Sequence, residues 1–166
     1  NEAAGDYIKI GLNENATAGF SYGEDEYDLP EPINTAFVDL TIRHDNWVGL
    51  LDKNGNVANS ARFLHDKRPF LSPEENQVWI INSHCENFKG SVQLSWEFNK
   101  LDEKYEINLY TAESKYDLRL METINLNSEE ISEMFLVVGN GEFRQPSLPT
   151  DFAITSIPCS SGVYWA

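Results

Sequence analysis

Three histidines are the side chains best suited to acid–base or metal chemistry in this chain, and two of them directly precede an aspartate. The pairs are His44-Asp45 and His65-Asp66, and the third histidine, His84, precedes Cys85. A metal-dependent hydrolase of the His–Asp type holds such pairs on packed helices, whereas these pairs are expected at a strand end and in a loop, without a zinc-binding spacing. His84 and Cys85 would point to opposite faces of a strand, which argues against a catalytic pair.

Other catalytic patterns are also missing from the sequence. It contains no Gly-x-Ser-x-Gly nucleophile elbow and no glycine-rich phosphate loop. Carboxylates suited to glycoside hydrolysis are abundant, but their spacing selects no pair. We therefore expect that the chain is not an enzyme. A small hydrolase would require two of the histidines to lie close together, beside carboxylates, in one cleft.

The acidic stretch GEDEYDLPEP, at 23–32, holds the densest group of oxygen ligands. Calcium binds several oxygen atoms at once, and Glu24, Asp25 and Asp28 are the carboxylates that we consider for it. The prolines at 30 and 32 favour an extended backbone, and carboxylates and prolines are also typical of protected sheet edges. The stretch therefore predicts either a structural calcium site or an acidic brace beside the first long strand.

Aromatic side chains outside the expected core are the candidates for holding a sugar ring. Binding proteins stack the faces of such rings against exposed aromatic side chains and place polar groups around them. Trp47 follows a strand end in a polar setting, Tyr22 and Tyr27 lie in or beside the acidic stretch, and Tyr110 lies on the polar face of its strand. The predicted ligand site consists of Trp47, Tyr22, Tyr27 and Tyr110, with His44 and Asp45 as polar partners. The alternative is that these rings pack along an open edge of the fold.

The elements that must position these residues are β-strands, because the dominant pattern is alternation of apolar and polar residues. Strands are predicted at 36–44, 77–84, 91–98, 105–112, 116–120 and 133–139. The segment 52–56 (DKNGN) resembles half of a calcium loop, but its Asn-Gly favours a hairpin turn. The best helical candidate, 126–135, is short and runs into a strand. The sequence predicts an all-β fold, an antiparallel β-sandwich of jelly-roll or immunoglobulin-like type.

Length and composition are those of one domain with two unusual ends. The chain has 166 residues, of which 41% are hydrophobic. We expect a β-sandwich domain at 1–144, with an acidic N-terminal lead-in, and an extended tail or linker at 145–166, where prolines at 146, 149 and 158 interrupt regular structure. The two cysteines, Cys85 and Cys159, allow at most one disulfide within the chain.

The charge excludes several classes of partner. Twelve basic and 27 acidic residues make a net charge of −15, which repels phosphate backbones and anionic membrane surfaces. We therefore expect no nucleic acid and no membrane as partner. No apolar run approaches the length needed to span a bilayer, and the first residues do not form a signal peptide.

Short segments resemble a known kind of module. The segments 15–20 (NATAGF), 27–32 (YDLPEP) and 90–96 (GSVQLSW) resemble a carbohydrate-binding-like β-sandwich accessory module of secreted bacterial multidomain proteins. The segment 148–154 (LPTDFAI) resembles the linker that leads to a C-terminal sorting domain in such proteins. The resemblance implies a secreted, extracellular accessory domain joined to other domains of a parent protein, and it carries no catalytic residue.

These observations lead to two expectations of function. The first is a noncatalytic extracellular carbohydrate-binding module of a larger secreted enzyme or surface protein, with a polysaccharide as partner and structural calcium as the one cofactor to consider. The second is a structural spacer or protein-interaction domain with no small-molecule ligand. A groove shared by the candidate aromatics would favour the first, and aromatics that are buried or scattered would favour the second.

Overall fold

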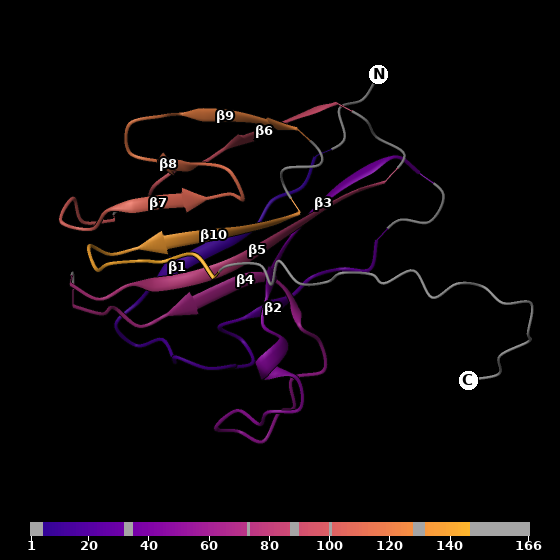
Figure 1. The fold of residues 1–166 in the computed structure, drawn as a ribbon. Helices are drawn as coiled ribbons and strands as arrows, with labels where there is room; N and C mark the ends of the chain where they lie inside the picture. Colours follow the sequence, from indigo (N-terminus) through magenta and orange to yellow (C-terminus); the bar gives the residue numbers. More distant parts are fainter. Residues whose placement is uncertain are drawn as a thin grey trace, which may run out of the picture.

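The computed structural model describes residues 5–31, 35–72, 74–86, 90–99, 101–127 and 132–146, whose regular structure is β-strand apart from one short 3-10 helix (Figure 1). The elements are β1 (Lys9–Leu12), β2 (Glu26–Tyr27), β3 (Phe37–Arg43), η1 (Asp45–Trp47), β4 (Arg62–Arg68), β5 (Gln77–Glu86), β6 (Ser91–Ser95), β7 (Ile107–Tyr110), β8 (Lys115–Asp117), β9 (Thr123–Asn127) and β10 (Glu133–Val138). The predicted all-β fold is confirmed. Within the described ranges, no helix is long and apolar enough to cross a bilayer.

The strands form two sheets of very different width. The main sheet has the strand order β1-β4-β3-β5-β10-β7-β8, with β2 also paired to β4, and the second sheet is the pair β6-β9. Among the described strands, the pairing of β1 with β4 is parallel and every other pairing is antiparallel. Figure 1 shows β6 and β9 together on one side of the molecule, away from β2 and η1. The arrangement is a sandwich with one broad layer and one narrow layer.

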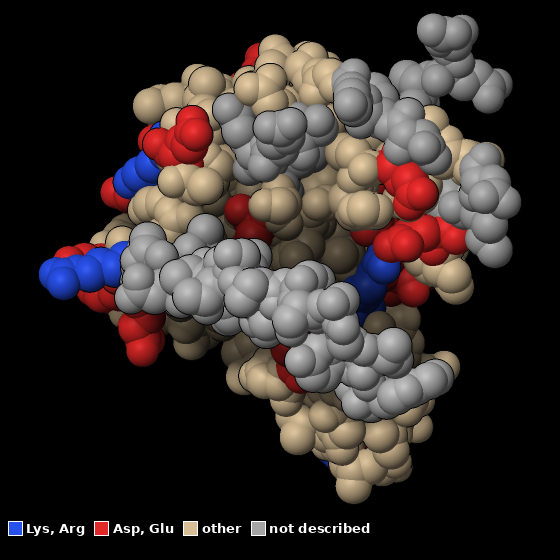
Figure 2. Space-filling model, turned by 45° about the vertical axis from the view of Figure 1, so that its right-hand side comes forward, with Lys and Arg blue, Asp and Glu red and all other residues tan. Residues whose placement is uncertain are grey.

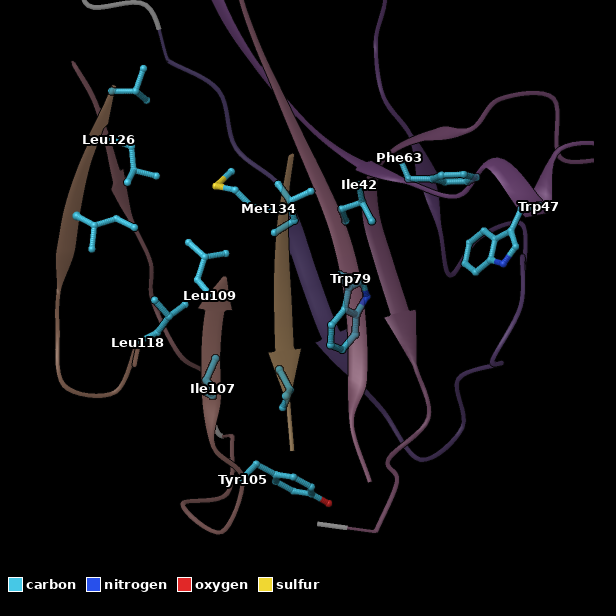
Figure 3. Packing of buried hydrophobic residues seen from close by; sticks show 14 of the residues in the cluster. Ile42, Trp47, Phe63, Trp79, Tyr105, Ile107, Leu109, Leu118, Leu126 and Met134 are labelled. Atoms are coloured by element: carbon cyan, nitrogen blue, oxygen red, sulfur yellow. The ribbon is translucent and has the colours of Figure 1, made fainter. Parts of the chain in front are cut away.

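The core lies between these layers, on one face of each strand. Along β5, Trp79 and Ile81 are buried, whereas Ile80 between them points to the opposite face and is exposed. Figure 3 shows Leu126 of β9 across the core from Met134 of β10, and Leu109 of β7 belongs to the same cluster. The cluster continues past Trp79 to Phe63 and Trp47 at its far end (Figure 3). The alternating pattern of the sequence therefore corresponds to the buried and exposed faces of the sheets.

One central strand is absent from the sequence prediction. β4 has the sequence RFLHDKR, which is rich in charge, so neither alternation nor an apolar run marks it. The expectation that His65 and Asp66 lie in a loop is therefore wrong. The predicted helix at 126–135 is also wrong for the residues that the structure describes. Its first residues are the end of β9, and its last residues are the beginning of β10. In both places the strand depends on pairing with neighbours that are distant in sequence.

The acidic stretch lies against the main sheet. Its residues Glu26 and Tyr27 form β2, which pairs with β4. Arg62, at the start of β4, donates hydrogen bonds to the carboxylates of Asp28, Glu31 and Asp39, with 2.7 Å from its Nη2 to Asp28 Oδ2 and 2.9 Å to Asp39 Oδ1. A single guanidinium thus ties the stretch to both β3 and β4. This geometry is the acidic brace that was one of the two alternatives for the stretch.

Two of the predicted boundaries need separate mention. The strand expected at 91–98 ends at Ser95, and beyond it Trp96 is half-buried and donates from Nε1 to the Leu118 carbonyl oxygen at 2.8 Å. Phe98, which was expected inside, is exposed. Of the tail predicted at 145–166, residues 147–166 lie outside the described part. Cys159 also lies outside the described residues, and Cys85 is half-buried.

Two methionines provide a test of where the core lies. Met134 is 1% exposed between the layers, whereas Met121 is 41% exposed. We expect Met134→Ala to lower the free energy of unfolding by about 2–5 kcal/mol, because it removes buried contacts and leaves a cavity. Met121→Ala should cost about 1 kcal/mol or less. Urea denaturation of both variants measures the difference, and equal losses would contradict this description of the core.

Candidate functional site

A polar cavity of about 380 Å³ lies on the face of the main sheet opposite the core, beside η1. It is lined by Ala18, Arg43, His44, Asp45, Asn46, Trp47, Arg68, Val78, Ile80, Asn82 and Glu133. Strand register explains the grouping, because Arg43 lies opposite Ile80 and Asn82 lies opposite Glu133, so these side chains share one face. His44 to Trp47 join them because the chain turns into η1 directly after β3.

A buried ion cluster forms one wall of the cavity. The carboxylate of Asp66 is 0% exposed, and its Oδ2 lies 2.7 Å from His44 Nε2 and accepts a hydrogen bond from Arg68 Nε at 3.0 Å. Arg68 also donates from Nη1 to the Val78 carbonyl oxygen at 2.7 Å, and its guanidinium lies 4.8 Å from the centre of the Trp79 ring. A carboxylate without water is stable only with such partners. Asp66 therefore holds the side chains of His44 and Arg68, which both line the cavity, in fixed positions.

The histidine pairs expected from the sequence are not the pairs in the structure. His44 pairs with Asp66, while Asp45 is exposed and lies 2.6 Å from Arg43 Nη2. The reason is that neighbours along the chain point in different directions, whereas residues on adjacent strands can share a face.

The other two histidines lie apart from this pair. His65 Nδ1 lies 2.7 Å from Glu26 Oε2, and burial lowers the pKa of His65. His84 is exposed and lies 3.7 Å from Glu86. Each histidine thus has a different carboxylate. In the described ranges, no group of three His, Cys, Asp or Glu side chains is arranged to hold a metal ion.

The candidate aromatics do not form one sugar-binding surface. Trp47 is 5% exposed, its ring stacks on His44 with centroids 3.6 Å apart, and it meets the Phe63 ring edge-on. Tyr27 is half-buried against Phe20, and its hydroxyl accepts a hydrogen bond from Asn59 N at 3.0 Å. Neither ring has a face free for a sugar. The expectation that these two rings stand exposed is wrong, because local polar sequence does not show what packs over a ring.

The remaining two aromatics lie elsewhere. Tyr22 is exposed, and its backbone N–H points to Asp52 in the hairpin that follows η1. Tyr110, on β7, packs against Phe143 with ring centroids 4.8 Å apart. Of the predicted ligand residues, the structure brings Trp47, His44 and Asp45 together at the cavity. The three tyrosines, Tyr22, Tyr27 and Tyr110, lie outside its lining.

The predicted calcium ligands face three separate groups of donors. Glu24 accepts a hydrogen bond from Thr17 N at 2.9 Å, which lowers the pKa of Glu24. Asp25 accepts from Ser21 N at 2.8 Å and is buried, and burial raises its pKa to about 6. Asp28 is bound by Arg62. A calcium ion would have to compete with each of these donors, and calcium binding stays a prediction.

The hairpin alternative for the segment 52–56 matches the structure. Asp52 accepts hydrogen bonds from Asn54 N and Asn56 N, both at 2.8 Å, and the Asn56 side chain and these backbone groups lower the pKa of Asp52 to about 2. Gly55 has φ of 84°, a left-handed conformation that glycine adopts without strain. Leu51 and Val57 close the hairpin.

Most of the cavity lining was not predicted, including the polar side chains of Arg43, Asn46, Arg68, Asn82 and Glu133. Asn82 matters most, because its Oδ1 is buried and has no hydrogen-bond partner. The one signal in the sequence that could have indicated this site is the charged run RFLHDKR, which has the length of a strand. Charged side chains in a central strand must find partners on neighbouring strands. Figure 2 shows acidic groups at several separate places on the face in view and basic groups at fewer, in keeping with the net charge of −15.

Comparison with known proteins assigns no family. No protein-family model, no curated protein and no solved structure matches this chain.

Two aspartates that each pair with an arginine provide a matched test of the ion cluster. Asp66→Ala would leave His44 and Arg68 without their buried partner, and we expect it to lower the free energy of unfolding by about 3–5 kcal/mol. Asp45→Ala removes a pair that is largely exposed, at 72% for the carboxylate, and should cost about 1 kcal/mol or less. Chemical denaturation measures both. A cost for Asp66→Ala as small as that for Asp45→Ala would show that the cluster does not organise this wall.

The carboxylate cluster around Arg62 predicts a pH effect with a definite sign. Burial raises the pKa of Asp39 to about 6, against the attraction of Arg62 and together with the repulsion of Asp28 and Glu31. Between about pH 4 and pH 6 the folded state holds a proton that an unfolded aspartate has lost, so this residue's contribution to stability falls as the pH rises.

Asp39→Asn cannot lose that proton and isolates the effect. The free energy of unfolding of the wild type minus that of Asp39→Asn should decrease as the pH is raised from 4 to 7. Urea denaturation across this range measures it. An increase would mean that attraction to Arg62 outweighs the burial of Asp39.

Proposed function

We propose that this domain is a noncatalytic carbohydrate-binding module of a secreted protein, and that the polar cavity beside η1 binds one sugar unit of a polysaccharide. The observation that carries the proposal is the lining of the cavity, where guanidinium, carboxylate, amide and imidazole groups converge. Small-ligand sites are typically concave and orient their ligands with a few well-placed polar groups. The proposal rests on this cavity and does not need an exposed aromatic surface.

The charges of the lining favour an uncharged ligand rich in hydroxyl groups. Arg43 and Arg68 face Asp45 and Glu133, so the cavity has formal charges of both signs in equal number. Elsewhere the chain is strongly acidic, with a net charge of −15. A sugar hydroxyl both donates and accepts hydrogen bonds and can therefore use both kinds of group. A simple cation or anion would meet a like charge.

The buried oxygen of Asn82 supports ligand binding more directly. A buried acceptor without a donor costs about 1–3 kcal/mol, and native proteins leave few of them. Asn82 Oδ1 is such an acceptor, and its side chain lines the cavity. A ligand hydroxyl that donates to it would recover this cost. Because Asp66 already holds His44 and Arg68 in place, little further ordering of the wall would be needed.

Two features support a noncatalytic role. The cavity lining contains no serine or cysteine that could act as a nucleophile. The carboxylate beside His44 is itself bound by Arg68, which favours a structural role for the pair. Secretion and attachment to further domains rest on the resemblance of the segments NATAGF, YDLPEP and GSVQLSW to secreted accessory modules.

Affinity electrophoresis in gels containing plant, algal or bacterial polysaccharides tests the proposal, with Asn82→Ala as the test variant and Asn125→Ala as its control. Asn125 lies exposed on β9, outside the cavity lining. We expect at least one polysaccharide to retard the wild type and Asn125→Ala, and Asn82→Ala to bind about 5–150-fold more weakly, as the loss of 1–3 kcal/mol implies. Absence of retardation for the folded wild type on every polysaccharide would rule the proposal out.

A protein-interaction domain is the second candidate, and one surface favours it. Val48, Leu50, Leu51 and Val57 are exposed on the hairpin after η1, next to the exposed Tyr22. Figure 1 shows this segment, between η1 and β4, projecting beyond the sheet. Apolar side chains gathered on a projection are typical of protein-binding surfaces. This candidate predicts that the wild type forms an assembly that Leu51→Ser disrupts, and that no polysaccharide retards the wild type.

A further inference from the structure

The two layers of the sandwich do not match in width, and the core is therefore open along one side. The second layer is only the pair β6-β9, whereas the main sheet continues through β3, β4 and β1. Side chains that point into the core there are only half-buried, including Leu40 on β3, Leu136 on β10 and Leu94 on β6. In a closed sandwich, side chains from the two inner faces interdigitate and exclude water.

An apolar cavity of about 600 Å³ occupies this opening. Its walls are the segment 6–12, which includes β1, the segment 93–98, which includes the end of β6, and the inner faces of β3, β5, β7 and β10. It reaches side chains that are fully buried, among them Trp79 and Met134. The volume lies within the range of about 300–1,000 Å³ that is typical of small-molecule sites. Protein cores seldom contain voids larger than a water molecule, so this one calls for an explanation.

The walls are held apart by backbone pairing, which keeps the cavity from collapsing. β1 is fixed by its parallel pairing with β4, from Lys9 opposite His65 to Leu12 opposite Arg68. On the other wall, Trp96 is fixed by its hydrogen bond to the Leu118 carbonyl oxygen at 2.8 Å. Closing the space would break these bonds, and an apolar occupant would instead recover the missing contacts.

The charges at the cavity oppose an anionic occupant. Of its described lining residues, Asp6 and Glu97 are acidic and Lys9 is the single basic one. The chain as a whole has a net charge of −15. A fatty-acid carboxylate would meet net repulsion at the cavity and from the rest of the protein. An uncharged ligand would meet none.

We propose that this cavity binds an uncharged, mainly aliphatic small molecule, for which a medium-chain alcohol is a suitable probe. The site is separate from the polar cavity beside η1, which lies on the other face of the main sheet, and it does not depend on the function proposed for that cavity.

Direct binding to the wild-type chain is the first test. Nile red, an uncharged apolar dye, should bind saturably with increased fluorescence, and 1-octanol should displace it at lower concentration than octanoate does. No saturable binding, as would follow if another part of the chain fills the space, overturns the proposal. Displacement by octanoate as effective as displacement by 1-octanol overturns the assignment of an uncharged ligand.

A pair of variants tests the location. Leu40→Trp should fill the opening and weaken dye binding at least about 10-fold, whereas Leu120→Trp, at a residue that is 82% exposed and outside the lining, should not change it. Binding that is unchanged in Leu40→Trp, with its fold verified by circular dichroism, places the dye elsewhere and contradicts the proposal.

Discussion

The fully buried carboxylate of Asp66 is the constraint on which much of this structure depends. A charge without water must be paired, and the pairing partners here come from β4 itself and from the end of β3. His44 is thereby held against Trp47, which sets the direction of η1, and Arg68 is held across the ring of Trp79. One ion cluster thus links the wall of the polar cavity to the core of the sandwich.

The same strand organises the acidic N-terminal part of the chain through Arg62. Three carboxylates, from Asp28, Glu31 and Asp39, converge on this guanidinium, and β2 pairs along β4 beside it. Burial raises the pKa of Asp39, and the repulsion of Asp28 and Glu31 adds to this effect and opposes the attraction of Arg62. β4 therefore acts as the charged axis of the broad layer, with one cation for the acidic brace and another for the core.

The unequal width of the layers has consequences on both faces of the main sheet. On the inner face, β6 and β9 cover only part of the available apolar surface, and an opening remains beside β1. On the outer face, η1 and its hairpin stand beside β5 and enclose the polar cavity. The two cavities differ in chemistry because β5 alternates, with Trp79 and Ile81 facing inward and Val78, Ile80 and Asn82 facing outward.

By itself, the sequence determined the all-β class and the strands whose alternation reflects one buried and one exposed face, such as β6, because that pattern is local. It also determined the hairpin at 52–56, where Asn-Gly supplies the turn. Only the tertiary structure decided that β4 is a strand, that His44 pairs with Asp66 and not with Asp45, and that Trp47 is buried. Each of these depends on which distant strands pair and in which register, and no local pattern of residues specifies that pairing.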